Sequence, residues 1–230
     1  MFGEVMPQSA VAVDLVILTI RGDEFQVLLV ERAKQPFLGA LALPGGFLEP
    51  GEDLAQAAHR ELAEETGLSA DGFHIEQVGG YGAPERDPRG RVVSICYMAL
   101  APDLPAPTAG GDARAASWVP VGELLAGPER LAFDHHRLLT DAVEQARDKL
   151  SYTNLAVSFC PPRFTISQLR RAYEIVWDVR LDPSNFRRKV TGVPGFLVAA
   201  GDESAPTGGR PATLYEPGPA TRLHPALPRD

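Results

Sequence analysis

The most informative stretch of the chain begins with Gly46-Phe47-Leu48-Glu49-Pro50-Gly51-Glu52, runs through seven further residues, and ends with Arg60-Glu61-Leu62-Ala63-Glu64-Glu65-Thr66-Gly67-Leu68. A glycine turn followed by helical apolar spacing predicts an amphipathic helix over residues 53–66, which Gly67 ends as a left-handed cap. Glu61, Glu64 and Glu65 stand at positions i, i+3 and i+4, which share one helix face. Three such carboxylates repel one another unless a cation lies between them, and oxygen ligands of this density suit Mg²⁺ or Mn²⁺. A solvated acidic face, the alternative, leaves the glycines and the spacing unexplained.

Charge is spread unevenly over the 230 residues, whose net charge is −8. Residues 1–150 contain 12 Lys and Arg against 23 Asp and Glu, whereas residues 151–230 contain 10 against 7. A chain of this length holds one large domain or two small ones. We therefore expect an acidic metal-binding part followed by a basic part that suits phosphates, and this asymmetry is a hint of nucleic-acid contact.

The cysteines and the apolar runs indicate the cellular compartment in which we expect the protein. Cys96 and Cys160 are too few for a disulfide framework and lack the spacing of a metal site. No run approaches the roughly 18 apolar residues of a membrane span, and Asp14 interrupts the apolar run at 11–20. With no leader pattern at the start of the sequence, we expect a cytoplasmic protein with no membrane partner.

The first part reads as a mixed-sheet sandwich between helices, complete by about Leu150, which makes residues 1–150 the first predicted domain. Besides the helix at 53–66, the expected strands are 11–20, 25–31, 73–80, 92–99 and 117–120, and the expected helices are 121–125 and 134–150.

After Ser151 the pattern changes to helix, turn, helix and hairpin. We expect a first helix from Phe164 to Trp177, a break over 178–182, and a second helix over 184–190. Two strands, 196–200 and 211–215, would flank a glycine-rich connection. This order predicts a small winged-helix domain over residues 151–217 and a flexible tail over 218–230. The fold class is therefore α+β.

The stretch from Gly46 to Leu68 resembles the Nudix box at every defined position: glycine, five residues, glutamate, seven residues, then Arg-Glu-aliphatic-any-Glu-Glu-any-Gly-aliphatic. Nudix enzymes cleave nucleoside diphosphates that are linked to another moiety. The resemblance implies an α/β/α Nudix sandwich in which Glu61, Glu64 and Glu65 bind the metal. It also implies catalytic roles for Glu64, Glu65 and Arg60. We expect Arg60 to fix these carboxylates, with Glu52 as its partner.

The same resemblance suggests where a ligand binds. Arg32 follows a strand at a place where such proteins often hold diphosphate, although an exposed surface arginine is an equal alternative. Gly45 and Gly46 lack side chains, so the backbone can approach a ligand there. Pro84 lies sixteen residues beyond Leu68, a distance at which the ADP-ribose-cleaving subgroup has a proline.

Further candidates lie in and near the loop that follows the box. Arg86 belongs to an arginine-rich loop over 81–91, and we include it among the ligand-binding residues. Tyr81 and Trp118 are candidates for stacking on adenine, with a place in the core as the alternative.

The sequence departs in one respect from that of active ADP-ribose pyrophosphatases, and the departure bears on hydrolysis. Active ADP-ribose pyrophosphatases commonly use a further glutamate from a loop after the box. The candidate stretch here, residues 110–117, contains one acidic residue, Asp112, and no glutamate. Glu85 and Glu123 are possible substitutes, and nothing in the sequence places either one. Metal binding is therefore better supported than hydrolysis.

In the second part, polar side chains collect on the second predicted helix. Asn185, Arg187, Arg188 and Lys189 suit contacts with base edges in a major groove. We expect three further residues to contact the DNA backbone or minor groove: Arg170, Arg171 and, at the wing tip, Arg210. A small helical cap with solvated arginines is the alternative.

Taken whole, the chain resembles the Nudix-related transcriptional regulators of NAD metabolism. The resemblance rests on the box, on residues 131–135, and on the segments 164–165, 185–189 and 209–215. It implies a homodimeric repressor of NAD synthesis or salvage genes that binds a palindromic operator and releases the DNA when ADP-ribose fills the Nudix domain. Two readings stay open beside it: an Mg²⁺-dependent ADP-ribose pyrophosphatase whose second domain only dimerises, and a nucleotide-binding protein with neither activity.

Overall fold

The computed structural model describes residues 8–67, 73–102, 104, 113–127, 131–203 and 212–229. The chain divides into two compact units, which are treated separately. The first comprises residues 1–18, 27–99 and 105–142, and the second comprises residues 19–26, 100–104 and 143–230. The predicted boundary after residue 150 falls inside helix α3 (His135–Tyr152), which begins in the first unit and ends in the second.

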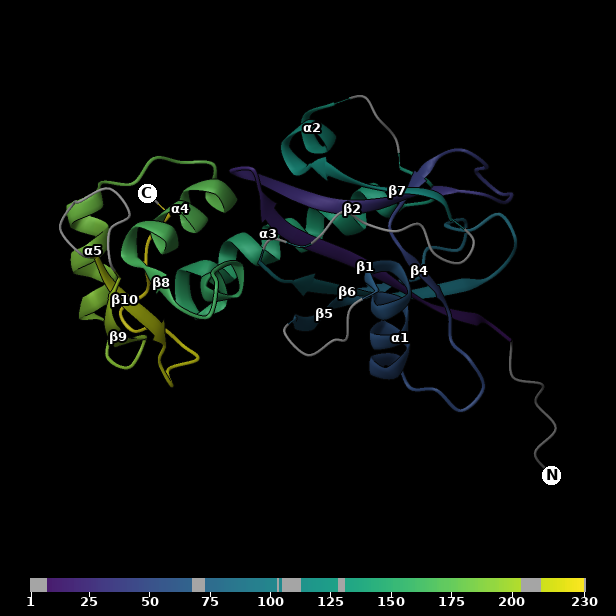
Figure 1. Cartoon of the computed structure of the whole chain (residues 1–230). Coiled ribbons are helices and arrows are strands. Elements are labelled where there is room, and N and C mark those ends of the chain that lie inside the picture. Colours follow the sequence, from purple (N-terminus) through teal and green to yellow (C-terminus); the bar gives the residue numbers. More distant parts are fainter. Residues whose placement is uncertain are drawn as a thin grey trace. The chain divides into compact units, whose positions relative to one another are not determined.

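A mixed seven-stranded sheet forms the centre of the first unit (Figure 1). Its main path runs in the order β3-β2-β1-β6-β5, with β4 paired to β1 and β7 paired to β2. The strands are β1 (Ala10–Arg21), β2 (Glu24–Arg32), β3 (Leu41–Ala42), β4 (Gly45–Phe47), β5 (His74–Tyr81), β6 (Val92–Leu100) and β7 (Ala113–Pro120). The antiparallel β1–β4 pairing sets Val13 opposite Gly46 and Asp14 opposite Gly45, which brings the glycines of the box onto the sheet.

Helices cover this sheet. The middle of β1, residues 13–18, is an uninterrupted buried run, which is typical of a strand covered on both faces. The helices are α1 (Leu54–Thr66), α2 (Val121–Ala126) and α3, and they agree with the predicted α/β/α Nudix sandwich. None of the described helices is long and apolar enough to cross a membrane.

Local signals define α1 at both ends. The Asp53 side chain accepts a hydrogen bond from the Gln56 N–H, and the Gln56 side chain accepts one from the Asp53 N–H, which forms a capping box. Gly67 ends the helix in the left-handed conformation at φ 69°. The helix buries Ala57, Ala58, Glu61, Leu62 and Glu65, so two carboxylates lie on its inner face.

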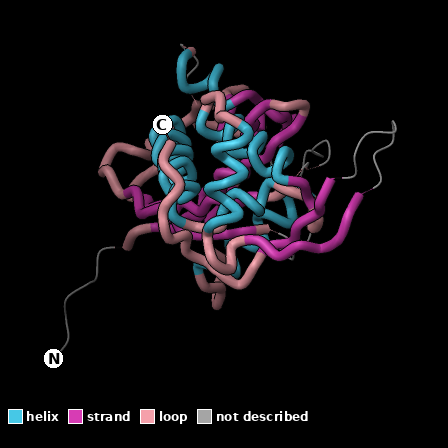
Figure 2. The backbone as a smooth tube through the Cα atoms, turned by 90° about the vertical axis from the view of Figure 1, so that its left-hand side faces the viewer, coloured by secondary structure: helices cyan, strands magenta, loops and turns pink. Residues whose placement is uncertain are grey.

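The second unit contains the predicted winged helix (Figure 2). Its elements are η1 (Leu155–Phe159), β8 (Phe164–Thr165), α4 (Ile166–Trp177), α5 (Pro183–Gly192), β9 (Leu197–Glu203) and β10 (Ala212–Pro217). The strands form an antiparallel sheet in the order β8-β10-β9. Helix α4 begins two residues later than the predicted start at Phe164, because residues 164–165 pair with β10. Thr165 then caps α4.

An aromatic cluster joins α4 to α5. The Tyr173 ring centroid lies 4.8 Å from that of Trp177 and 5.3 Å from that of Phe186 on α5. Both α4 aromatics also bond to the last turns of α3: the Tyr173 hydroxyl donates to the Leu150 carbonyl and the Trp177 indole donates to the Arg147 carbonyl. The outer face of α5 is left for polar side chains.

Residues 218–229 do not fit the flexible tail that the sequence predicts. Leu223 and Leu227 are buried, and their N–H groups donate to the carbonyls of Tyr152 at 2.8 Å and Ser151 at 2.7 Å. The reason is hydrophobic: two leucines spaced along a proline-rich segment find an apolar surface in the second unit.

Candidate functional site

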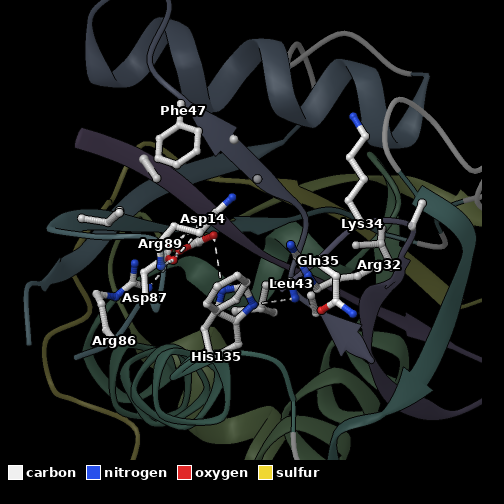
Figure 3. Close-up of a pocket in the computed structure, with 18 of the residues that line it drawn as sticks. Asp14, Arg32, Lys34, Gln35, Leu43, Phe47, Arg86, Asp87, Arg89 and His135 are labelled. Atoms are coloured by element: carbon white, nitrogen blue, oxygen red, sulfur yellow. Dashed lines mark hydrogen bonds and ion pairs between the residues drawn. The ribbon is translucent and has the colours of Figure 1, made fainter. Parts of the chain in front are cut away.

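A cavity of about 320 Å³ opens in the first unit beside the β1–β4 pairing (Figure 3). Its walls come from β1, β2 and the residues after it, β4, the loop between β5 and β6, and the start of α3. Four of the predicted ligand-binding residues line it: Arg32, Gly45, Gly46 and Arg86. The size is that of a small-molecule pocket.

Two guanidinium groups flank an aromatic ring in this cavity. Arg32 donates from Nε to the Pro36 carbonyl at 2.8 Å, and its guanidinium carbon lies 4.7 Å from the Phe133 ring centroid. The Arg89 guanidinium carbon lies 5.5 Å from the same centroid and 5.1 Å from that of Phe47. Both cations therefore lie at cation–π distance from aromatic faces. Arg89 also donates to Asp87 from Nε at 3.0 Å and from Nη2 at 2.6 Å. The positive charge of the two guanidinium groups suits the oxygens of a diphosphate.

Arg86 differs from these two because it is buried in an ion cluster. It donates to Asp134 from Nε at 3.0 Å and from Nη2 at 2.7 Å, and Nη2 also lies 3.4 Å from Asp14 Oδ2. Burial lowers the pKa of Arg86, but bonding to Asp134 and the charge of Asp14 raise it above its ordinary value overall. The sequence predicts Arg86 as a ligand contact; the structure assigns much of its hydrogen-bonding capacity to the protein itself.

His135 completes the inner wall. Its Nδ1 accepts a hydrogen bond from the Leu43 N–H at 2.9 Å, so the ring proton is assigned to Nε2, which lies 3.6 Å from Asp14 Oδ1. Burial lowers the pKa of His135, while the charge of Asp14 acts in the opposite direction. Ser94 donates to the other oxygen of Asp14. The imidazole is therefore a neutral, fixed part of the wall.

Two predicted ligand-binding residues do not line the cavity. The Tyr81 hydroxyl donates to Asp141 at 2.9 Å and the Arg137 guanidinium lies over its ring, so Tyr81 takes the core position that the sequence leaves as an alternative. Pro84 is exposed in the loop before Arg86. Trp118 is half-buried in β7 and is not among the lining residues either.

Arg60 holds the acidic groups of the box together. It donates to Glu52 from Nε at 2.9 Å and from Nη2 at 3.0 Å, as the sequence predicts. Its Nη1 donates to Glu61 Oε1 at 2.6 Å and lies 3.7 Å from Glu64 Oε2. Nη2 reaches the Phe47 carbonyl on β4 at 3.2 Å. Arg60 therefore ties the helix to the turn that precedes it.

The three carboxylates of α1 differ in their surroundings. Glu61 and Glu65 are 6% and 9% exposed, whereas the Glu64 side chain is 53% exposed. Burial, together with the smaller effect of the charges of Glu61 and Glu64, raises the pKa of Glu65 to about 7. Burial also raises the pKa of Glu61.

Within the described part of the chain, no three Asp, Glu, His or Cys side chains are gathered as a ready-made metal site. The predicted convergence is therefore incomplete, because Arg60 occupies Glu61 Oε1 and Glu64 is largely in solvent. Two features nevertheless fit a divalent cation. Glu65 Oε2 is buried without a hydrogen-bond partner, and a Cβ on Gly46 would collide with Glu61 Oε1, so only glycine lets the backbone lie against that carboxylate. The donors are all oxygens, as Mg²⁺ requires.

The candidate substitutes for a loop glutamate stay away from the cavity. Glu85 and Glu123 are exposed, and neither lines it. Asp112 lies outside the described residues.

Helix α5 presents a polar face in the second unit. Asp182 caps it, and Pro183 occupies its first turn. Asn185, Arg187 and Arg188 are exposed, and Arg188 donates to the Asn185 side chain at 2.7 Å. Lys189, also predicted for DNA contact, is half-buried on the same helix.

Arg170 and Arg171 are engaged elsewhere. Arg170 donates to buried Glu174 at 2.9 Å and to the Leu181 carbonyl at 3.0 Å, which fixes the turn between α4 and α5. Arg171 donates to Asp23 at 3.0 Å. Their predicted contact with the DNA backbone stays a prediction. Arg210 lies outside the described residues.

Sequence reasoning missed Asp14, Arg89, Phe133 and His135 as parts of the cavity wall. One signal was available: an aspartate inside an otherwise apolar strand is a buried polar residue, which asks for a partner or a function. The others depend on which loops meet in space.

Two family models match the chain. The NUDIX domain matches residues 9–142, and the NrtR DNA-binding winged helix domain matches residues 156–216.

Similar proteins include a transcriptional repressor and solved structures with DNA and with ADP ribose. The chain is 36% identical to the ADPR responsive transcriptional repressor NtrR of Acinetobacter baylyi over 91% of this chain and 82% of that protein. Shewanella oneidensis NrtR, solved in complex with a 27mer DNA, superposes with a TM-score of 0.79 at 31% identity, over 95% of this chain and 99% of that chain. The NUDIX domain of the same Shewanella protein, solved with ADP ribose, superposes at 0.55 with 36% identity, over 61% of this chain and 90% of that chain.

Proposed function

Because the chain belongs to the NrtR family, in which a NUDIX domain precedes a DNA-binding winged helix domain, we propose that it is an ADP-ribose-responsive repressor of NAD synthesis or salvage genes. The observation that carries this proposal is the pairing, in one chain, of a cationic small-molecule cavity with an exposed basic helix. A transcriptional repressor acts where the chromosome lies, so we place the protein in the cytoplasm.

Helix α5 is the element that we assign to the major groove. Asn185 and Arg188 bond to each other, so they present their remaining donors from a shared, pre-ordered arrangement. Arg187, exposed beside them, supplies a phosphate contact. The wing formed by β9 and β10 follows in the order that a winged helix requires. We expect a homodimer, because a palindromic operator is read by a two-fold pair of helices.

ADP-ribose is assigned to the cavity of the first unit. Arg32 and Arg89 supply positive charge for its diphosphate, and both guanidinium groups lie over Phe133. Hydrogen bonds to the Pro36 carbonyl and to Asp87 hold them. The Arg86–Asp134–Asp14 cluster and His135 form a rigid wall behind them. Ligand binding weakens DNA binding if it favours an arrangement of the dimer that cannot reach both half-sites.

A divalent metal is assigned to the carboxylates of the box. Glu65, with its unpartnered Oε2, and Glu64 would hold Mg²⁺ or Mn²⁺ together with Glu61. A metal bound there supplies charge for a diphosphate and an activated water. Arg60 keeps Glu61 in position from the protein side.

The test is a gel shift with duplex from the protein's own promoter region, with and without ADP-ribose, in the presence of Mg²⁺. We expect a shifted band that ADP-ribose abolishes. Arg32→Met should keep the shift and lose the response, whereas Arg137→Met, at an exposed arginine outside the cavity, should keep both. The absence of a shifted band at low salt would refute the proposal.

A second function is favoured by one observation, the complete Nudix box with a glutamate of raised pKa in its helix. In this alternative the protein is an Mg²⁺-dependent ADP-ribose pyrophosphatase. Release of AMP and ribose 5-phosphate that Glu65→Gln abolishes would support it. Both activities can coexist in one chain, so the gel shift is the more decisive experiment.

A further inference from the structure

The segment 218–229 lies beyond the residues that match the winged helix domain, and yet it is built into the second unit. The Gly218 N–H donates to the Phe196 carbonyl at 2.7 Å, and the Ala220 N–H donates to the Gly195 carbonyl at 2.9 Å. A Cβ on Gly218 would collide with the Gly195 carbonyl, so this approach requires glycine. We call residues 218–229 the strap.

The strap then passes the end of α3. Arg222 forms a backbone bridge with Thr153, and the N–H groups of Leu223 and Leu227 donate to carbonyls of the last helical residues. Both leucine side chains are at most 4% exposed, although their strap neighbours are exposed. In Figure 2 the strap is the pink segment that ends at the C label, beside the cyan helices.

The far end of the strap and α5 line the same small cavity. Leu227 and Pro228 share the lining of a cavity of about 140 Å³ with Trp177, Asn185 and Phe186. Phe186 is one of the two buried side chains that seat α5, and Asn185 is on the exposed face assigned to DNA. A change at Leu227 therefore alters a cavity that Phe186, which seats α5, also lines.

We propose that the strap positions α5 for base recognition, so that Leu227 is a positioning residue for sequence-specific DNA binding. This inference rests on the proposed function of α5. The physical reason is that base contacts depend on the exact placement of side chains, whereas phosphate contacts tolerate small shifts. Loosening the strap should lower affinity for the operator more than affinity for unrelated DNA.

The experiment compares two duplexes by fluorescence anisotropy with the full-length chain. One is the promoter duplex that the wild-type protein shifts, and the other is a shuffled duplex of the same composition. Leu227→Ala is the main variant, and Pro228→Gly is a milder change in the same cavity wall. Ala226→Ser, at the exposed neighbouring position, is the matched control. Leu227→Met tests rescue by a side chain of similar volume.

We expect Leu227→Ala to reduce the ratio of specific to non-specific affinity about tenfold, the scale of one base contact. Non-specific affinity should change by less than about twofold, because the phosphate contacts remain. Leu227→Met and Ala226→Ser should keep the wild-type ratio, and ADP-ribose affinity should be unchanged in every variant.

If affinity for both duplexes falls equally, or falls for neither, the ratio of specific to non-specific affinity is unchanged. The first outcome would assign the strap a purely structural role, and either would overturn the inference. If Leu227→Ala does not fold, the same comparison with Pro228→Gly decides. A wild-type protein that binds neither duplex would remove the proposed function and the inference together, whereas a specific wild type with an unaffected variant removes the inference alone.

Discussion

Replacing Arg86 and Arg89 separately with methionine should have opposite consequences, although both arginines line the same cavity and both pair with aspartate. The Arg86 side chain is 4% exposed and bonds to Asp134 and Asp14; the Arg89 side chain is 45% exposed and bonds to Asp87. Removing one partner from a buried ion pair costs about 3–5 kcal/mol because the other charge stays buried. In the second pair only Arg89 is exposed, since the Asp87 side chain is 2% exposed. Asp87 keeps the backbone N–H of Arg89 as a donor, so the loss should be about 1–2 kcal/mol.

The assay is urea unfolding followed through Trp118 in a Trp177→Phe background, so that the signal reports on the first unit. With a slope of about 2 kcal/mol per molar urea, Arg86→Met should lower the midpoint by about 1.5–2.5 M. Arg89→Met should lower it by only about 0.5–1 M and should also reduce ADP-ribose affinity about tenfold, the scale of one charge-assisted hydrogen bond. Equal midpoints for the two variants, or unaltered ADP-ribose binding by Arg89→Met, would refute the assignment of a structural role to one arginine and a ligand role to the other.

Three further outcomes are expected. The pKa of Glu65 is raised from 4.5 to about 7, so the stability linked to its protonated form is present below pH 4.5 and is lost as the pH rises through 7. In EDTA at pH 8, the free energy of unfolding of Glu65→Gln should therefore exceed that of the wild type by about 1–3 kcal/mol, as measured by urea unfolding. This difference should vanish towards pH 4.5; a pH-independent difference would contradict the raised pKa of Glu65 as its cause. Arg187→Met should reduce the slope of log K against log salt for DNA binding by about 1, whereas Arg170→Met should chiefly lower thermal stability because it leaves buried Glu174 without its counter-charge; the reverse pattern would show that the roles are exchanged. Gly46→Ala should weaken Mg²⁺ binding measured by calorimetry, because its Cβ displaces the Glu61 carboxylate, and undiminished Mg²⁺ affinity would argue against a metal at Glu61.

The elements that sequence predicts well are those with coinciding local signals. Helix α1 has a capping aspartate, helical apolar spacing and a terminal glycine, and it lies within one residue of the predicted bounds. The pair α4 and α5 is predicted for similar reasons. The short η1 was not predicted, because five residues carry no periodicity to detect.

The cavity wall was less accessible to sequence reasoning because it depends on pairing across the sheet. Asp14 faces the box only because β1 pairs with β4 in the observed register. The roles of arginines were ambiguous for a related reason: exposure cannot be read from residue type. For Arg170 a local signal existed, since Glu174 lies four residues later on the same helix, where such pairs bond.

The hydrogen bond from the Leu43 N–H to His135 has a consequence for how the protein responds to acid. A second proton on this imidazole would displace the backbone donor and place a cation on a buried side chain, so mild acidification leaves the ring uncharged. Histidines often make proteins sense acidity near neutrality. Here the hydrogen bond from the main chain removes that sensitivity, so His135 stays uncharged over the range of pH found inside a cell.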